Sequence, residues 1–349
     1  MKTIVTGGAG FIGSTLVKKL INELNYEVLV IDSLTYASNK ESLSNVWNNK
    51  LMHFEKADIS DVTKINKIFK DFKPNYVFNL AAETHVDRSI DDPGVFIKTN
   101  ILGTFSLLQA SLNYWRDLPP EKNNFKFLHI STDEVFGDLK DSDPAFSENS
   151  NYQPSSPYSA SKAGSDHLVR SWYRTYKLPI LLSNCSNNYG PYQFYEKLIP
   201  LMIVKALRGE ELPLYGKGNQ VRDWLYVEDH VDALVKIIRD GQIGQSYNVG
   251  ASCERTNLQV VELICTILDE LVDIKPKNVS SFSELISFVE DRPGHDRRYA
   301  IDPEKIFREL NWKAQIDFET GLKKTITWYV ERINSIDYEI PRMGKGIET

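Results

Sequence analysis

The stretch TGGAGFIG, residues 6–13, decides the fold. It follows a short apolar run and opens a stretch of helical period from Phe11, so its glycines lie on a strand-to-helix turn. Gly7, Gly10 and Gly13 allow the backbone to approach a pyrophosphate and present the first N–H groups of the helix to that anion. The stretch therefore predicts a dinucleotide-binding unit, with a glycine-rich turn that holds no ligand as the plainer alternative.

Beyond this turn, short apolar runs alternate with longer stretches of helical period, as is typical of a parallel sheet with helices on both faces. We expect a doubly wound, Rossmann-type α/β domain at 1–189, with ligands outside the carboxyl ends of its strands. A smaller C-terminal substrate-binding lobe is expected mainly at 190–335, with a strand near 245–250 that returns to the main sheet as an open alternative, followed by a polar tail at 336–349. The predicted strands are 2–6, 27–32, 52–58, 76–81, 125–130 and 179–185, and the predicted helices are 11–25, 62–72, 93–115, 158–177, 196–208, 228–240 and 256–271.

The composition is that of an ordinary globular protein, with 42% hydrophobic and 25% charged residues among 349. The net charge is −6 and the basic residues are scattered, so we expect no nucleic-acid partner and no binding to an anionic membrane. Cys185, Cys253 and Cys265 fit neither a disulfide framework nor a zinc site, so a cytoplasmic location and no metal are expected. The N-terminus lacks a basic region followed by a long apolar segment, so neither secretion nor membrane insertion is expected.

The second predicted strand ends in Asp32, at the place where a carboxylate accepts hydrogen bonds from the ribose hydroxyls of an adenosine. A carboxylate here repels a 2′-phosphate, so NAD is favoured over NADP as the cofactor. Taken by itself, Asp32 could instead cap the turn that follows. Asp58 and Ile59, at the end of the third predicted strand, are placed to meet the adenine.

Tyr158 and Lys162 lie four residues apart in a predicted helix, so both side chains point from one face. An ammonium beside a phenol lowers the pKa of the phenol, which makes it a general base for a substrate hydroxyl. Such a pair is more often simply solvated. The nucleotide-binding turn upstream, and Ser131 and Thr132 at the end of the fifth strand, favour the catalytic interpretation here.

Two carboxylates, Asp133 and Glu134, follow the apolar run at 125–130 in the stretch STDEVFG, residues 131–137. Neighbouring negative charges raise the pKa of at least one of them, so a shared proton provides an acid beside a base. A helix cap or a surface pair is the plainer alternative. At the carboxyl end of a strand, however, the pair lies where a nicotinamide and a substrate should meet.

The sequence resembles the extended short-chain dehydrogenase/reductase superfamily at Gly7, Gly10, Gly13, Asp32, Thr132, Tyr158 and Lys162. Within that superfamily it is similar to the dTDP-glucose 4,6-dehydratases, from Met1 to about residue 330. Two loops depart from the pattern, with Ser38 in place of an expected Gly and Tyr195 in place of an expected Pro. The motifs that carry the similarity are AAETHVDRSI (81–90), HISTDEVFGDL (129–139), SPYSASKAGSDHLVRSW (156–172) and DRPGHDRRYAID (291–302).

The resemblance implies that dTDP-glucose loses water to give dTDP-4-keto-6-deoxyglucose, a deoxysugar precursor, while bound NAD takes hydride from C4 and returns it to C6. In this scheme Tyr158 is the base at O4, Glu134 removes the C5 proton, and Asp133 protonates the departing O6. Thr132 assists Tyr158, and Lys162 tunes the phenol and holds the nicotinamide ribose.

The resemblance also implies further contacts with the cofactor and the substrate. Arg222 and Arg292 suit a diphosphate because a guanidinium makes bidentate contacts, although either could form a surface ion pair instead. The additional NAD contacts are Phe11, Ile12, Ser33, Leu34, Thr35, Leu80, Ala81, Ala82, Thr84, Thr99 and Asn188. The nucleotide-sugar contacts are Thr84, Thr132, Asn187, Lys197, Leu198, Pro213, Tyr215, Arg222, Asn257, Asp291, Arg292 and His295.

Three other functions stay open at this point: a 4,6-dehydratase for UDP- or CDP-glucose, a 4-epimerase, and a catalytically silent NAD-binding protein. An epimerase has no use for Asp133 and Glu134, and a silent protein should have lost Tyr158, Lys162 or the acid pair. Thymine differs from uracil by one methyl group, so the residues alone do not identify the nucleobase. The apolar faces of the predicted helices at 93–115 and 158–177 resemble the dimer-forming pair of the superfamily, so a homodimer is expected.

Overall fold

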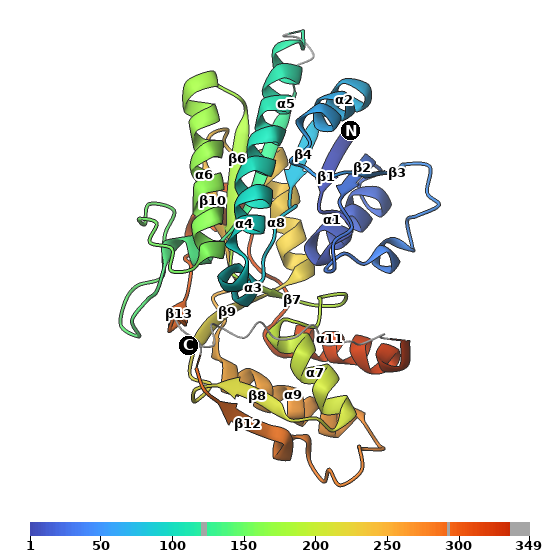
Figure 1. Ribbon diagram of the computed structural model, residues 1–349, viewed down its shortest axis with the longest axis vertical. Coiled ribbons are helices and arrows are strands. Elements are labelled where there is room, and N and C mark those ends of the chain that lie inside the picture. The colour runs from blue at the N-terminus through green and yellow to red at the C-terminus, as the bar shows by residue number, and fades with distance from the viewer. Residues whose placement is uncertain (120–123, 292–293, 336–349) are drawn as a thin grey trace.

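The computed structural model describes residues 1–119, 124–291 and 294–335, which form an α/β domain with a smaller lobe beneath it (Figure 1). The domain is built on a seven-stranded parallel sheet in the order β10-β6-β5-β4-β1-β2-β3, which confirms the predicted doubly wound fold. The strand order reverses beside β1, and this is where such sheets bind ligands. The strands are β1 (Lys2–Thr6), β2 (Glu27–Asp32), β3 (Met52–Lys56), β4 (Tyr76–Asn79), β5 (Lys126–Thr132), β6 (Ile180–Cys185) and β10 (Ser246–Val249).

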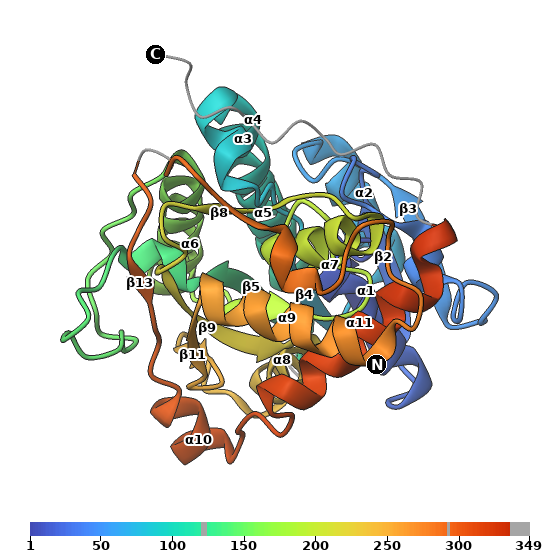
Figure 2. The ribbon, with the colours of Figure 1, turned by 90° about the horizontal axis from the view of Figure 1, so that it is seen from below.

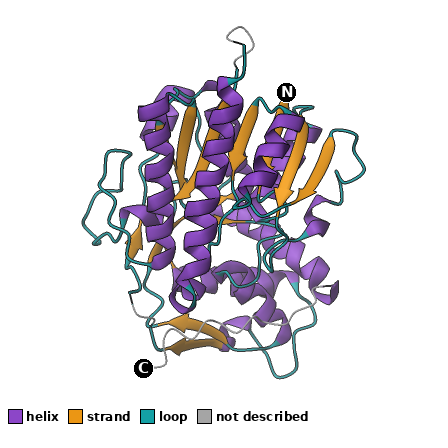
Figure 3. Cartoon of the chain, turned by 45° about the horizontal axis from the view of Figure 1, so that its top comes forward, coloured by secondary structure: helices purple, strands orange, loops and turns teal. Residues whose placement is uncertain are grey.

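Helices cover both faces of this sheet (Figure 3). On one face α1 and α8 bury Leu16, Leu20 and Leu234 in a shared apolar cluster, and α10 joins them. On the other face α2, α5 and α6 bury Phe69 and Leu108 in a second cluster. The bounds are α1 (Phe11–Asn22), α2 (Val62–Phe72), α5 (Thr104–Arg116), α6 (Pro157–Tyr176), α8 (Val227–Asp240) and α10 (Glu304–Leu310).

The helix predicted at 93–115 is interrupted. After α3 (Val86–Asp91), a short α4 (Pro93–Phe96) runs into a π-helical segment, η2 (Ile97–Gly103), before α5 begins. Within η2 the side chain of Asn100 accepts a hydrogen bond from Glu83 N (2.9 Å) and donates to Glu83 O (3.0 Å) and Ser161 Oγ (2.8 Å). Asn100 thereby fixes the segment after β4 against α6, a role that hydrophobic periodicity cannot reveal.

The lobe has an apolar core of its own, which includes Ile203, Ile264, Phe282 and Leu322. Figure 2 shows α9 and α11 crossing beneath the sheet domain, with α7 beside them. A second, four-stranded sheet of β7, β9, β11 and β13 joins the lobe to the domain. The bounds are β7 (Asn187–Tyr189), α7 (Leu198–Arg208), β8 (Leu212–Tyr215), β9 (Val221–Tyr226), β11 (Glu254–Thr256), α9 (Asn257–Leu271), β12 (Ile286–Val289), β13 (Arg298–Tyr299) and α11 (Phe318–Arg332).

The stretch at 190–335 supplies most of the lobe, but parts of it belong to the sheet domain. β10 pairs in parallel with β6, with Tyr247 opposite Ser183, and α8 and α10 pack against the same core. The chain therefore passes back and forth between the two cores. The tail predicted at 336–349 lies outside the described residues.

The described residues contain neither a candidate membrane span nor a candidate metal site. No helix at 1–119, 124–291 or 294–335 is both long and apolar enough to cross a membrane. Within the same ranges, no group of three or more His, Cys, Asp or Glu side chains is arranged to hold a metal ion.

Candidate functional site

A cavity of about 520 Å³ lies at the carboxyl ends of the central strands, bounded on the lobe side by residues that precede α7. Most of the predicted cofactor residues line it. Leu34 does not, and its N–H instead donates to Asp32 Oδ1. The lining includes Gly7, Gly10, Phe11, Ile12, Gly13, Asp32, Ser33, Thr35, Asp58, Ile59, Leu80, Ala81, Ala82, Thr84, Thr99, Tyr158, Lys162 and Asn188.

The glycine turn leaves no room for side chains. Gly7 has a φ of +67°, and a Cβ on it would lie 2.8 Å from Ala81 N. A Cβ on Gly13 would lie 2.2 Å from Gly7 O. No side chain caps α1, which begins after Gly10, so the first N–H groups of the helix are left for an anion. This cradle fits the pyrophosphate of a dinucleotide.

Asp32 is almost fully buried at the end of β2 and anchors the loops on both sides of the cavity. Its Oδ2 accepts from Ala9 N (2.9 Å), and its Oδ1 accepts from Leu34 N (2.8 Å) and Ser38 Oγ (2.8 Å). The capping role that the sequence left open is therefore present. A carboxylate oxygen accepts about two hydrogen bonds, so Oδ2 keeps capacity for a ribose hydroxyl, and the residue fits NAD.

The start of α6 places the predicted catalytic helix. Ser156 and Ser159 form a capping box, and Pro157 occupies the first helical turn, where a missing N–H does no harm. Tyr158 and Lys162 are both buried, and both line the cavity. The ammonium of Lys162 donates to Ile130 O at 2.8 Å.

The pKa of the Tyr158 phenol differs from the prediction. Burial raises the pKa of Tyr158 well above the ordinary value, and Glu134 adds to the increase, while a hydrogen bond with Thr132 opposes it. The sequence predicted a lowered pKa because Lys162 is nearby. In the structure the Lys162 ammonium is directed at a backbone carbonyl, and carboxylates surround the phenol, so the lowering does not occur.

The acid pair lies on a short 3₁₀ turn, η4 (Asp133–Phe136), directly after β5. Thr132 Oγ1 accepts from Glu134 N (3.3 Å) and donates to Asp133 Oδ1 (3.2 Å). Asp133 is 2% exposed and its Oδ2 has no hydrogen-bond partner among the described residues, whereas Glu134 is half-buried. Burial, followed by the charge of Glu134, raises the pKa of Asp133 well above the ordinary value. The turn thus offers a protonated acid beside a more accessible carboxylate.

The predicted substrate residues fall into two groups. Thr84, Thr132, Asn187 and Lys197 line the cavity, and Lys197 Nζ donates to Thr84 O at 2.8 Å. Leu198 is the first residue of α7, immediately after this group.

The second group lies on the lobe, outside the lining of the cavity. The rings of Tyr215 and His295 are 5.9 Å apart, and His295 Nδ1 lies 2.6 Å from Asp291 Oδ1. Gln220, which the sequence analysis did not single out, donates to Asp291 Oδ2 (2.9 Å) and accepts from Asn257 N at its backbone oxygen (3.0 Å). Gln220 therefore links two predicted residues, Asp291 and Asn257.

The remaining predictions concern the strands of the lobe and one arginine outside the described residues. Pro213 lies in β8, paired with Ser287 of β12. Arg222 is buried on β9 and donates to the backbone oxygens of Val221 (2.7 Å) and Asp296 (3.0 Å). Arg292 is not among the described residues.

Two acidic residues of the lining were missed by the sequence analysis. Glu83 and Glu196 line the cavity, and burial raises the pKa of each. Glu196 lies 3.5 Å from Arg88 Nε and accepts from Tyr36 OH at 3.4 Å. These partners come from separate segments, so the one available signal was the position of Glu196 beside Lys197.

Comparisons with known proteins identify the relatives of this chain. A family model described as GDP-mannose 4,6 dehydratase matches residues 4–325. The chain is 52% identical to the dTDP-glucose 4,6-dehydratase of Neisseria meningitidis serogroup B over 352 residues, with 99% of each chain covered. It is 55% identical to dTDP-glucose 4,6-dehydratase 1 of Escherichia coli strain K12 over 346 residues, covering 97% of this chain and 95% of the relative.

Solved structures give the same picture. The dTDP-glucose 4,6-dehydratase DesIV of Streptomyces venezuelae, crystallised with NAD, has a TM-score of 0.87 at 38% identity, with 96% of this chain and 98% of that chain covered. The UDP-glucose 4-epimerase of Thermotoga maritima has a TM-score of 0.82 at 30% identity, with coverage of 95% and 100%. The chain therefore belongs to the GDP-mannose 4,6 dehydratase family of the extended short-chain dehydrogenase/reductases and, within that family, to the dTDP-glucose 4,6-dehydratases.

Proposed function

We propose that this enzyme converts dTDP-glucose to dTDP-4-keto-6-deoxyglucose and water, and so supplies a precursor for deoxysugar synthesis. The observation that carries the proposal is the buried Asp133 beside the more exposed Glu134, at the end of the strand that faces Tyr158. The names of relatives at 52% to 55% identity support the same reaction.

NAD is the cofactor, and the glycine turn and Asp32 would hold it. When bound, it supplies an acceptor for the hydride of C4 and later a donor of hydride to C6. The remaining chemistry consists of proton transfers, and residues of this chain carry them out.

The first proton transfer takes place at O4 of the glucose. Tyr158 takes the O4 proton as C4 is oxidised to a ketone, with Thr132 hydrogen-bonded to the phenol. Tyr158 must first release its own proton to solvent, and the positive charge of Lys162 favours the resulting phenolate, which then accepts the O4 proton. The ketone makes the C5 proton acidic, since the carbanion left at C5 is an enolate.

The second stage is the loss of water. Glu134 removes the C5 proton, and Asp133 gives its proton to O6, which leaves as water with the C6–O6 bond broken and a C5–C6 double bond formed. The raised pKa of Asp133 suits these roles, because the buried acid holds its proton while its neighbour Glu134 remains accessible. After hydride reaches C6, Glu134 returns a proton to C5.

A 4-epimerase shares the fold, and the Thermotoga maritima epimerase is 30% identical to this chain. Epimerisation at C4 needs Tyr158, Lys162 and the cofactor, but no acid at O6. Asp133, buried and with a raised pKa, has no task in that reaction. Dehydration is therefore the reaction in which both Asp133 and Glu134 have a role.

The test is incubation of the purified protein with dTDP-, UDP- and CDP-glucose in turn, with the products identified by mass and NMR. We expect the 4-keto-6-deoxy product, formed most rapidly from dTDP-glucose. No such product from any of the three would overturn the proposal, and faster turnover of the UDP or CDP sugar would overturn the assignment of the nucleobase.

We also propose that the enzyme is a cytoplasmic homodimer with a nucleotide-binding domain at 1–189 and a mainly substrate-binding lobe at 190–335. In support of the dimer, large apolar side chains are exposed on neighbouring helical surfaces of the sheet domain. Ile97 is 45% exposed and Leu102 is 52% exposed, and Val95, Phe105 and Tyr176 extend the patch. The free state of all three cysteines is consistent with a reducing compartment.

A further inference from the structure

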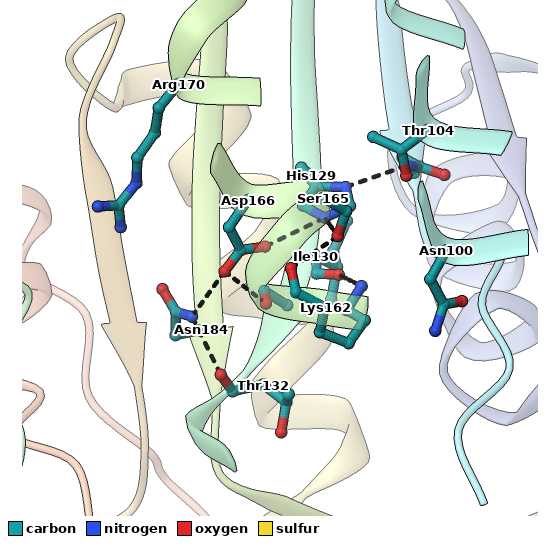
Figure 4. A network of polar contacts seen from close by, with 12 residues as sticks. Asn100, Thr104, His129, Ile130, Thr132, Lys162, Ser165, Asp166, Arg170 and Asn184 are labelled. Atoms are coloured by element: carbon teal, nitrogen blue, oxygen red, sulfur yellow. Dashed lines mark hydrogen bonds and ion pairs between the residues drawn. The ribbon is translucent and has the colours of Figure 1, made fainter. Parts of the chain in front are cut away.

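Behind the catalytic strand, Asp166 of α6 is fully buried and does not line the cavity (Figure 4). Its Oδ2 accepts from Ser131 Oγ (2.8 Å) and Tyr152 OH (2.9 Å). Asn184 connects this carboxylate to the end of β5, because its Nδ2 lies 3.5 Å from Asp166 Oδ2 and donates to Thr132 O at 3.0 Å. Burial alone would raise the pKa of Asp166, but the interactions with His129, the charge of Lys162 and the hydrogen bond from Ser131 outweigh burial and lower the pKa. The buried carboxylate is thus ionised and requires a positive charge nearby.

His129 is not that positive charge. Asn79 Oδ1 accepts from Thr6 Oγ1 (2.8 Å), so the amide nitrogen of Asn79 faces His129 Nδ1 at 3.0 Å, and Nδ1 must be the acceptor. The ring proton is therefore on Nε2, which lies 3.1 Å from Ser165 Oγ and 3.3 Å from Asp166 Oδ1. Burial, together with Lys162, lowers the pKa of His129 to about 4, so the ring is neutral at physiological pH.

Arg170 is also separated from the carboxylate. Its Nη2 donates to Tyr152 OH (3.0 Å) and Ser246 Oγ (3.2 Å), so Tyr152 stands between the guanidinium and Asp166.

Lys162 is the remaining candidate for the positive charge beside Asp166. It lies one helical turn before Asp166 on the same face of α6, which places the two Cβ atoms roughly 6 Å apart. Both side chains are buried, and the Lys162 ammonium donates one hydrogen bond to Ile130 O. Burial lowers the pKa of Lys162, and Asp166 is the carboxylate that opposes this.

We propose that Asp166 is a positioning residue for the proposed reaction: its carboxylate is the fixed negative charge that stabilises the Lys162 ammonium behind Tyr158. This inference rests on the proposed function for its consequence in catalysis, but not for the charge pair itself. The helix carries the base, the cation and the countercharge at Tyr158, Lys162 and Asp166, each one turn after the last.

Other ionisable and polar groups surround this pair. Their titration also contributes to the way in which activity and stability depend on pH. On α6 these are Tyr158 and Arg170, and from β5 and the turn after it they are His129, Asp133 and Glu134. β6 contributes Cys185, the segment before α6 contributes Tyr152, and the uncharged Asn100 and Thr104 come from η2 and α5. Burial raises the pKa of the Cys185 thiol to about 12, so this thiol does not titrate in the relevant range.

The first experiment is a pH profile of kcat/KM for the wild type, Asp166→Asn and Tyr152→Phe. Without the countercharge, Lys162 loses its proton at lower pH, so the alkaline limb of the Asp166→Asn profile should move down by about one pH unit or more. Tyr152→Phe is the matched control, since it removes one hydrogen bond from the same oxygen and keeps the charge. Its alkaline limb should stay in place. An unchanged limb in Asp166→Asn, or an equal shift in the control, would overturn the proposal.

The second experiment needs no turnover. Denaturation midpoints of the cofactor-free protein are measured for the wild type, Asp166→Asn, Lys162→Met and the double variant. Asp166→Asn should lower the midpoint in the wild type, less so as pH rises and Lys162 becomes neutral, and much less in the Lys162→Met background. An equal loss in both backgrounds would assign Asp166 a purely structural role. If the enzyme lacked activity on every sugar nucleotide while this coupling persisted, the proposed function alone would be wrong.

Lys162→Met gives a separate answer in case Asp166→Asn does not fold. In that variant the buried carboxylate has lost its countercharge, so its pKa in the folded state rises above that of the unfolded chain. Stability is then lost as pH rises through the folded pKa, and the deficit relative to the wild type should grow between about pH 5 and pH 8. A deficit that does not change with pH would contradict the charge pair.

Discussion

At the scale of single residues, burial, neighbouring charges and hydrogen bonds together set the protonation state of each ionisable group in the site. Asp133 is buried beside Glu134 and holds its proton, while Asp166 accepts several hydrogen bonds behind the same strand and is ionised. Burial, followed by the charge of Glu134, also raises the pKa of Tyr158 and holds its proton. One helix and one strand end thus provide an acid, a base and a countercharge through differences in solvation and hydrogen bonding.

Glu134→Gln should stop the reaction after the oxidation at C4. The amide cannot accept the C5 proton, whereas Tyr158 and the cofactor are unchanged, so the absorbance of the reduced nicotinamide should appear and persist after substrate is added. Overall turnover should fall by roughly a hundredfold or more. Normal turnover would require the C5 base to lie elsewhere in the cavity, and Glu55→Gln on β3, outside the cavity lining, serves as the control.

Asp133→Asn should be more stable than the wild type at pH 8 while losing activity. The pKa of Asp133 is raised in the folded state, so its contribution to stability is fully present below about pH 4 and is lost as pH rises through the folded pKa. The amide carries no charge to desolvate at any pH. Urea denaturation of the cofactor-free protein at pH 8 and pH 5 measures the difference. A gain at pH 5 that equals the gain at pH 8 would contradict this origin.

Residue types and spacing predicted the acid pair, the Tyr158–Lys162 pair and Asp32 from the sequence, because each lies at a strand or helix end recognisable from local pattern. Local pattern could not predict Glu196 or Gln220. Their partners come from distant segments, and an isolated Glu or Gln in a loop resembles any solvated residue. The shift in the pKa of Tyr158 was predicted in the wrong direction. Local pattern reveals neither the burial of the phenol nor the hydrogen bond that directs the Lys162 ammonium to Ile130 O.

At the scale of elements, the turn between β1 and α1 and the start of α6 bring the proposed cofactor cradle and the proposed catalytic pair to one cavity. Both depend on short-range chemistry: glycines in the first, and a capping box with Pro157 in the second. Strand and helix positions were therefore predictable to within a few residues. The π-helical η2 is an exception, because its sequence has the periodicity of a continuous helix. The other exceptions are elements that were not predicted: α3, β7, β8, β9, β11, β12, β13, α10 and α11.

Gly13→Ala should weaken NAD binding by at least about tenfold, since its Cβ would lie 2.2 Å from Gly7 O and would force the turn open. Gly94→Ala is the matched control, as a Cβ at Gly94 would come no closer than 3.4 Å to Asp92 Oδ1. Calorimetric titration of each variant with NAD gives the two dissociation constants. Equal affinities would place the pyrophosphate somewhere other than this turn.

At the scale of the whole molecule, the sheet domain and the lobe together bound one cavity. The sheet domain supplies the cofactor side, and residues 193–197 before α7 supply the other. The sequence predicted the sheet domain and the lobe because the regular alternation of predicted strands and helices ends near Tyr189. It offered the return of a strand near 245–250 as an open alternative, which β10 bears out, but it did not predict the short helix α10 that also packs against the sheet domain.

The proposed dimer makes a prediction at this scale. Leu102→Lys combined with Phe105→Lys should convert the protein to a monomer, because two charges would then have to be buried in the contact. Sedimentation equilibrium measures the mass. Ile274→Lys, at a lobe position that is 89% exposed, is the control and should leave the mass unchanged. A dimer that survives the paired substitution would locate the interface elsewhere.

The repeated passage of the chain between the two cores constrains how this protein can be rebuilt. Crossings follow β7, β9, β10, β13 and α10, so a protease that cuts one of them leaves the two parts covalently joined by the others. For the same reason no single gene segment encodes the lobe. A chimera that exchanges it with a relative must replace several separate stretches and keep α8, β10 and α10 in place, so new substrate preferences are more directly reached by changing individual loops around the cavity.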